Sequence, residues 1–264
     1  MYTAIYTYIT NKILSIMSKL INVIHTSTSA QIPCTMPASG LHITYWDIRG
    51  LCQPIRLALA YAKVEYTDVR IDAGNPAETD TYKKVWFDVK PEVGKTVKFV
   101  NLPYLMDGDN KVAISQSQAI LRYIGRKFNL LGKSEVTTDV LLSEVYDFDS
   151  RFTNMCYSNF GQMKGYCENS LPGVLDKFAE QLVSCNNTFI TGEEISIVDF
   201  KFYDLLTKWK IVEADESIST NKVLSNKDIC DYIERMENID AIKQYITSDI
   251  FLSRPLNNPH ATFK

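Results

Sequence analysis

The stretch NLPYLMDGDNKVAISQS, residues 101–117, decides the fold of the first half of this chain. Two short runs rich in apolar residues, 102–106 and 111–114, flank the tetrapeptide DGDN. An Asp-Gly pair between two such runs is typical of a β-hairpin. Beyond it, apolar residues recur at helical spacing through residues 116–129, so the sequence predicts two antiparallel strands followed by a helix.

Pro103 is the informative residue of the hairpin, because proline removes a backbone donor and is confined to special positions in strands. We expect a cis Leu102–Pro103 peptide bond, which would present the backbone of Leu102 to an extended peptide ligand. A trans proline opening an edge strand is the general expectation for an X-Pro bond, and only the surrounding pattern favours the cis form.

The sequence before the hairpin predicts a strand, a helix and a second strand. Residues 41–45 alternate and are rich in β-forming types, residues 53–62 have Pro54 near a first helical turn, and residues 66–71 are again β-forming. The resulting order, β-α-β followed by β-β-α, is that of a thioredoxin-like domain, which we place at residues 41–127.

From residue 135 onward the sequence shows helical periodicity and no strand signal. Ser196 and Asp199 form a variant of the capping box, in which the serine accepts a backbone N–H and the acid reaches back. The predicted fold class is α/β plus all-α: an N-terminal thioredoxin-like domain, a linker at 128–134 and an all-helical C-terminal domain at 135–264. Helices are expected at 140–155, 171–185 and 197–209 and within 223–246, whereas 72–100 is expected to be a long polar loop.

Residues 1–39 differ from the rest of the chain. They contain no acidic residue, many Ser and Thr, and only Lys12 and Lys19 as cations, and their most apolar run, residues 13–24, is broken by polar residues. We expect an extraneous or disordered leader. A transit peptide would be rich in Arg, which this segment lacks, and a start of translation at Met36 is the other alternative.

Composition excludes several classes of protein. The 264 residues carry a formal net charge of −3 and are 45% hydrophobic, which is ordinary for a globular protein and gives no electrostatic footprint for nucleic acid. Uninterrupted apolar stretches are too short to predict a membrane span. The only three histidines, His25, His42 and His260, are scattered, so we expect no histidine-rich metal site and no histidine-based triad.

Six cysteines are widely spaced without a C-x-x-C pair. A chain of this size needs no disulfides, and no convincing secretory signal accompanies the cysteines. Reduced thiols in a cytoplasmic protein are the better interpretation.

Several motifs stand in order along the chain: ITYWDIRGL (43–51), PIRL (54–57), NLPYL (101–105) with DG (107–108), QSQAIL (116–121), IVDF (197–200) and FLSRP (251–255). Taken together, these features resemble the cytosolic glutathione S-transferases, and most closely the mu class. The resemblance extends in order from residue 41 to the C-terminus, and the loop around Trp86 resembles a mu-class insertion. It implies a homodimeric detoxification enzyme that conjugates glutathione, as co-substrate, to hydrophobic electrophiles without a cofactor or metal.

The resemblance assigns catalytic roles to two tyrosines. Tyr45 ends the first predicted strand and matches the residue whose hydroxyl stabilises the glutathione thiolate. Tyr157 matches, across a two-residue deletion, a second tyrosine that assists some mu-class reactions. Without the flanking pattern, Tyr45 would be interpreted as a buried strand aromatic.

The resemblance also implies a glutathione site. Ser117 lies at the start of a helix, where free N–H groups favour the γ-glutamyl carboxylate, although serine there is equally an ordinary helix cap. Lys83 stands where the mu pattern has Arg, and Asp149 matches an acid that reaches the glutathione of the neighbouring subunit; a solvated helix carboxylate is the alternative. The predicted glutathione-binding residues are Trp46, Leu51, Lys83, Trp86, Lys90, Asn101, Leu102, Pro103, Gln116, Ser117 and Asp149.

The electrophile pocket departs most from the mu pattern. Asn257 and Asn258 replace a Phe-Ser pair there, which predicts a more polar wall. Phe99 matches an aromatic key that enters the partner subunit, with a core phenylalanine as the alternative. The residues expected to form an apolar wall, unless they simply pack in the core, are Ile48, Leu51, Phe148, Phe152 and Met155.

Two other functions stay open on the sequence. The same fold serves as a non-catalytic binding or structural protein, although such relatives commonly lose the catalytic hydroxyl or the peptide-binding residues that this chain keeps. An isomerase or peroxidase use of the same thiolate is the other alternative, because the second pocket does not name its ligand.

Overall fold

The computed structural model describes residues 20–184, 188–218 and 224–264 and divides the chain into two compact units. The first runs to Leu121 and includes residues 240–259; the second contains residues 122–239 and 260–264. This division differs from the expected linker at 128–134 in two ways. The boundary falls inside helix α4 (Ser117–Lys127), and a segment near the C-terminus joins the first unit.

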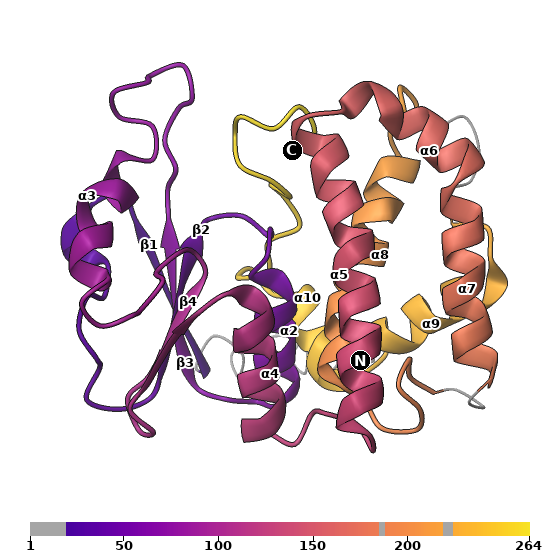
Figure 1. The fold of residues 1–264 in the computed structure, drawn as a ribbon, viewed down its shortest axis with the longest axis horizontal. Coiled ribbons are helices and arrows are strands. Elements are labelled where there is room, and N and C mark those ends of the chain that lie inside the picture. The colour runs from indigo at the N-terminus through magenta and orange to yellow at the C-terminus, as the bar shows by residue number, and fades with distance from the viewer. Residues whose placement is uncertain (1–19, 185–187, 219–223) are drawn as a thin grey trace, which may run out of the picture. The chain divides into compact units, whose positions relative to one another are not determined.

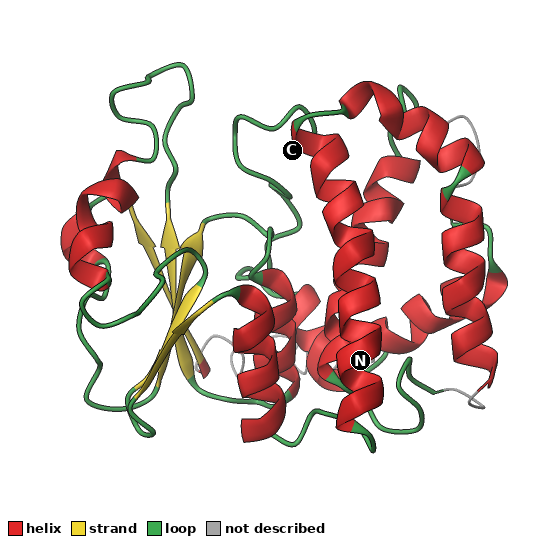
Figure 2. Cartoon of the chain, viewed as in Figure 1, coloured by secondary structure: helices red, strands yellow, loops and turns green. Residues whose placement is uncertain are grey.

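The first unit is built on a five-stranded sheet of order β1-β3-β2-β4-β5 (Figures 1 and 2). β1 and β2 each run parallel to β3, whereas β4 is antiparallel to both β2 and β5. Helices α2 (Gln53–Tyr61) and α4 lie on one face and α3 (Lys84–Val93) on the other, which confirms the thioredoxin-like domain. The strands are β1 (Ile21–Thr26), β2 (Leu41–Trp46), β3 (Tyr66–Ile71), β4 (Tyr104–Asp107) and β5 (Val112–Ser115).

Three elements of this unit were not predicted. Residues 20–39 are ordered and supply β1 and the short 3-10 helix η1 (Ser29–Gln31), so the expectation of a disordered leader is wrong for them. Their apolar anchors, Ile21 and Ile32, are each only 3% exposed, and this burial offsets the entropy of ordering the chain. Residues 1–19 lie outside the described residues. Helix α3 replaces the predicted loop, and Pro91 inside it concealed the helical pattern.

Helix α10 (Asp240–Ile246) belongs to the first unit and packs against α2. The amide of Gln53, on α2, donates a hydrogen bond of 3.3 Å to the hydroxyl of Tyr245. This hydrogen bond joins α10, and with it the C-terminal segment 240–259, to α2.

All named elements in the described residues of the second unit are helices. Its centre is α8, which packs on α5 and opens with the predicted capping box: Val198 N donates to Ser196 Oγ at 3.3 Å, and Ser196 N to Asp199 Oδ2 at 2.8 Å. Within the described ranges, no helix combines the length and the apolar character needed to cross a membrane. The elements are α5 (Glu135–Tyr157), η2 (Phe160–Gln162), α6 (Met163–Asn169), α7 (Leu171–Ser184), α8 (Ile197–Glu213) and α9 (Lys227–Glu237).

Candidate active site

The hydroxyl of Tyr45 lies against the turn that follows strand β2. The side chain is largely buried, and the backbone N–H of Leu51 donates a hydrogen bond of 3.2 Å to Tyr45 Oη. Gly50 has φ +43°, and a Cβ atom built on it would lie 2.5 Å from Tyr45 Oη. A phenol oxygen that accepts a hydrogen bond becomes a better donor through its own proton. The turn therefore both positions the hydroxyl and polarises it.

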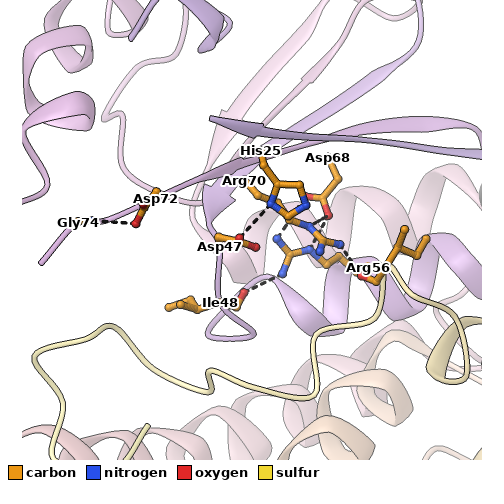
Figure 3. Close-up of polar contacts among 9 residues, drawn as sticks. His25, Asp47, Ile48, Arg56, Asp68, Arg70, Asp72 and Gly74 are labelled. Atoms are coloured by element: carbon orange, nitrogen blue, oxygen red, sulfur yellow. Dashed lines mark hydrogen bonds and ion pairs between the residues drawn. The ribbon is translucent and has the colours of Figure 1, made fainter. Parts of the chain in front are cut away.

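Backbone contacts fix the loop 47–51 that forms this turn. Arg56 Nη1 donates to the carbonyl of Ile48 at 2.8 Å (Figure 3). Two further bonds, each of 3.0 Å, run from Arg49 N to Pro255 O and from Gly50 N to Leu256 O, within the same unit. The loop is therefore held both by the sheet unit's own helix α2 and by the returning C-terminal segment.

A buried charge cluster supports Arg56. Asp68 accepts hydrogen bonds from Arg56 Nε at 2.9 Å and from Arg70 Nε at 2.8 Å, and the three side chains are almost wholly buried. Burial alone would raise the pKa of Asp68, but the charges of Arg56 and Arg70 hold it below its ordinary value. Sequence reasoning missed this cluster. Its signal was Arg56 on an apolar helix and two opposite charges, Asp68 and Arg70, at alternate positions of one strand.

Four predicted residues form two pairs of lysine and tryptophan in the first unit. Lys83 Nζ lies 5.8 Å from the ring centre of Trp46, and Lys90 Nζ lies 6.0 Å from that of Trp86. Burial lowers the pKa of Lys83. The Trp86 ring stacks on Tyr104, directly after Pro103, with 6.0 Å between ring centres. In each pair, the lysine ammonium suits a ligand carboxylate and the tryptophan ring suits an apolar part of the same ligand.

The Leu102–Pro103 peptide bond is cis, which confirms the prediction. Leu102 is buried, whereas Asn101 is exposed. The segment before Asn101 is tied to the end of β5, because Ser115 Oγ donates to the carbonyl of Phe99 at 2.9 Å. The structure therefore brings residues 99–103 beside the start of helix α4.

Helix α4 begins with Ser117, which is buried, while Gln116 occupies the capping position. Gln116 has φ +74°, a left-handed conformation that is uncommon for a residue with a side chain, and its carbonyl accepts from Ile120 N at 2.9 Å. Such strained positions cluster at ligand-binding sites. The first N–H groups of the helix suit an anion.

Asp149 does not fit the role predicted for it. Its side chain is 3% exposed and pairs with Lys201 and with Lys208, the latter at 3.3 Å. Burial would raise the pKa of Asp149, but the two lysines lower it to about 2. A carboxylate enclosed in this way cannot reach a ligand held by another subunit, so this prediction is wrong. Asp147, two residues earlier on α5, is exposed.

Tyr157 belongs to the helical unit, where its half-buried ring lies 4.9 Å from the ring of His260. Its catalytic role stays a prediction. Three residues of the expected apolar wall instead form the core of this unit: Met155 is buried, and Phe148 and Phe152 contact Trp209 at ring-centre distances of 5.9 and 4.9 Å. In the first unit Ile48 is buried and Leu51 half-buried, and Asn257 and Asn258 are buried as well.

Phe99 is 93% exposed and has φ +52°. The alternative of a core phenylalanine is therefore wrong.

Comparison with known protein families identifies the family of this chain. The model of the glutathione S-transferase N-terminal domain matches residues 41–126, and that of the glutathione S-transferase C-terminal domain matches residues 146–249. The chain belongs to the glutathione S-transferase family.

Curated relatives of this chain include enzymes named as mu-class glutathione S-transferases, which confirms the resemblance. The chain is 36% identical to glutathione S-transferase Mu 3 of Macaca fuscata fuscata over 228 residues, 84% of this chain and 95% of the relative. It is 35% identical to the Homo sapiens Mu 3 enzyme over 84% of this chain and 95% of that one, and 37% identical to rat (Rattus norvegicus) Mu 7 over 80% and 93%. Among solved structures, the pi-class glutathione S-transferase of Onchocerca volvulus superimposes with a TM-score of 0.69 at 29% identity, over 84% of this chain and 99% of that one.

Proposed function

We propose that this chain is a glutathione transferase in which Tyr45 donates a hydrogen bond to the glutathione sulfur and holds it as a thiolate. The observation that carries the proposal is the hydrogen bond from Leu51 N to Tyr45 Oη, which holds the phenol at the end of β2. The substrates are glutathione and hydrophobic electrophiles, and the reaction forms a thioether and detoxifies the electrophile.

The energetic contribution of the phenol can be sized. A thiol with a pKa of about 8.5 is only a few per cent ionised at neutral pH. A hydrogen bond to a charged acceptor is worth roughly 1.5–3 kcal/mol, which lowers that pKa by about one to two units. A two-unit drop raises the thiolate fraction roughly 25-fold. Nucleophilicity falls about 8-fold at a Brønsted slope of ~0.45, so the net gain is a few-fold and most acceleration comes from placing the electrophile beside the thiolate.

The remaining predicted residues account for the ends of glutathione. Lys83 and Lys90 suit the glycyl carboxylate, with the Trp46 and Trp86 rings as apolar neighbours. The start of helix α4, at Gln116 and Ser117, suits the γ-glutamyl carboxylate. Asn101 and the backbone of Leu102 would pair with the peptide in between.

Tyr45→Phe tests the proposal, because it removes the hydroxyl and keeps the ring. We expect kcat/KM to fall roughly 10- to 150-fold, the equivalent of a lost charge-assisted hydrogen bond of about 1.5–3 kcal/mol, while glutathione affinity changes little. The loss exceeds the few-fold gain from ionisation because the hydroxyl also fixes the position of the sulfur relative to the electrophile. The ultraviolet absorbance of the bound thiolate, titrated against pH, should shift to higher pH by one to two units.

Equal turnover in Tyr45→Phe would reject Tyr45 as the thiol activator. A second outcome bears on the activity itself. If the unsubstituted chain binds glutathione but forms no thioether with any of several electrophiles, it is a non-catalytic binding protein.

We propose a homodimer as the working form, with Phe99 entering the second copy. The exposed ring of Phe99 stands out from the first unit, and the helical unit offers a pocket of about 260 Å³ between α5 and α7. Burying one phenylalanine side chain contributes about 1.5–3 kcal/mol, so one ring is a substantial anchor. The apolar residues of that pocket are Leu141, Phe148, Val174 and Phe178.

Phe99→Ser should weaken this dimer and shift it toward the monomer by sedimentation velocity at micromolar concentration, because the exposed ring is lost without disturbing a core. Phe87→Ser is the matched control, since Phe87 is 58% exposed on the same unit and is not assigned to the interface. A Phe99→Ser variant that sediments as the unsubstituted chain does would show that the key lies elsewhere.

We also propose the cytoplasm as its compartment and no resident cofactor, with glutathione as co-substrate. In the described ranges Cys34, Cys52, Cys156, Cys167 and Cys230 form no disulfide, which suits a compartment where glutathione is kept reduced.

A further inference from the structure

Residues 20–35, which we call the strap, lie before the stretch that the family model matches, which begins at residue 41. The structure nevertheless orders the strap within the first unit. Its contacts reach several elements that hold the proposed glutathione site.

The strap first extends the sheet. All six residues of β1 pair in parallel with β3, from Ile21 opposite Tyr66 to Thr26 opposite Ile71. The pairing continues one step further, because Asp72 N donates to Thr26 O at 2.9 Å. Without β1, strand β3 would be a sheet edge with unpaired backbone groups.

The strap then crosses the sheet on the face that carries α3. It starts at the β1 edge, its helix η1 packs against α3, and its next residues reach β4. There the hydroxyl of Tyr104, a fully buried residue, donates to the carbonyl of Pro33 at 2.7 Å, and Thr96 Oγ1 donates to Cys34 O at 2.7 Å. Tyr104 directly follows Pro103 and stacks on Trp86, so the strap supports two predicted ligand residues from behind.

A third contact reaches the loop that positions Tyr45. The Nδ1 atom of His25, on β1, lies 3.0 Å from Oδ2 of Asp47 (Figure 3). Asp47 follows Tyr45 by two residues in the sequence. The same loop is held from its other side by Arg56 through Ile48 O. Because the His25 side chain is 61% exposed, this pair alone contributes little, and the strap acts through its whole length.

We propose that the strap is a positioning segment of the glutathione site: it holds β3, Tyr104 and the loop 47–51 in the geometry that binds glutathione and aims the Tyr45 hydroxyl. This inference rests on the proposed function only where its test measures the KM for glutathione and the pKa of the bound thiol. The attachment of the strap is measurable without any substrate.

The test detaches the strap in the full-length chain by charging its two buried anchors, Ile21→Asp with Ile32→Asp. The control carries the same added charge on exposed neighbours, Asn22→Asp with Gln31→Glu. In the anchor variant we expect faster amide hydrogen exchange in residues 66–71. We also expect a KM for glutathione raised about tenfold, because binding must then order the residues that the strap holds in place. The pKa of the bound thiol should rise as well, which mere loss of stability would not cause, and the control should match the unsubstituted chain.

An anchor variant that loses exchange protection in residues 66–71 but keeps its KM and thiol pKa would overturn the proposal. If the anchor variant does not fold, Tyr104→Phe decides, since it removes the hydroxyl that bonds to Pro33 O and keeps the ring that stacks on Trp86: a raised KM supports the proposal and an unchanged KM overturns it. Failure of the proposed function looks different, because thiolate absorbance would then be missing in the unsubstituted chain.

Discussion

Asp68→Ala is expected to lower the free energy of unfolding by about 3–5 kcal/mol, because it leaves Arg56 and Arg70 as buried, unpaired charges. The loss should also release the loop 47–51, since Arg56 donates to Ile48 O from a position fixed by Asp68. Urea unfolding, followed by tryptophan fluorescence, measures the change. The lowered pKa of Asp68 stabilises the fold above the ordinary carboxyl pKa of about 4, and this contribution is lost as the pH falls below it.

Asp88→Ala is the matched control, because Asp88 pairs with Lys84 on the surface of α3, where both side chains are more than half exposed. Its effect should stay within about 0.5 kcal/mol. Replacing the whole cluster by apolar residues, as Arg56→Met, Asp68→Leu and Arg70→Met together, should recover much of the loss. Equal effects of Asp68→Ala and Asp88→Ala would show that the buried cluster contributes no more to the free energy of unfolding than a surface ion pair does.

Gly50→Ala is expected to lower kcat/KM by roughly 10²-fold, comparable to a displacement of the reacting groups by 1 Å. The new Cβ would lie 2.5 Å from Tyr45 Oη and 2.7 Å from Tyr45 Cε1, so the phenol must move. Steady-state kinetics with glutathione and a chromogenic electrophile measures the loss. In the Tyr45→Phe background the same substitution should cost far less, because the hydroxyl it displaces is already gone.

Gly40→Ala separates this clash from backbone strain. Gly40 also has a left-handed φ, +74°, but a Cβ there meets no atom within 4 Å. The control should lose about 1 kcal/mol of stability and keep its turnover within twofold. If Gly50→Ala and Gly40→Ala show the same kcat/KM, the position of the Tyr45 hydroxyl does not limit the reaction.

Local chemistry made the β-α-β and β-β-α elements within residues 41–127 predictable, and also the start of helix α8. The hairpin signal at Asp107-Gly108 and the capping box at Ser196 depend on neighbours within a few residues, and both are present. The cis bond at Pro103 was also predicted, because the surrounding β-β-α pattern narrows the positions that proline can take.

Other features depend on residues distant in sequence. Asp149 is enclosed by Lys201 and Lys208, which lie 52 and 59 positions further on, and nothing near Asp149 announces them. β1 was missed because a single apolar run does not reveal which strand edge will accept it. Helix α3 was missed because Pro91 falls within a short helix and breaks its apparent pattern. The charges of Arg56, Asp68 and Arg70 were visible, but their convergence required the sheet and α2 to be placed together.

The bonds from Arg49 N and Gly50 N to the carbonyls of Pro255 and Leu256 have a consequence for synthesis on the ribosome. The turn beside Tyr45 is formed by residues 47–51, yet two of its backbone partners follow residues 122–239 of the helical unit in the chain. The first unit therefore gains these contacts only after residues 122–239 of the helical unit have been translated. A nascent chain released before Pro255 would carry every predicted thiol-activating and glutathione-binding residue while lacking the closure of that turn.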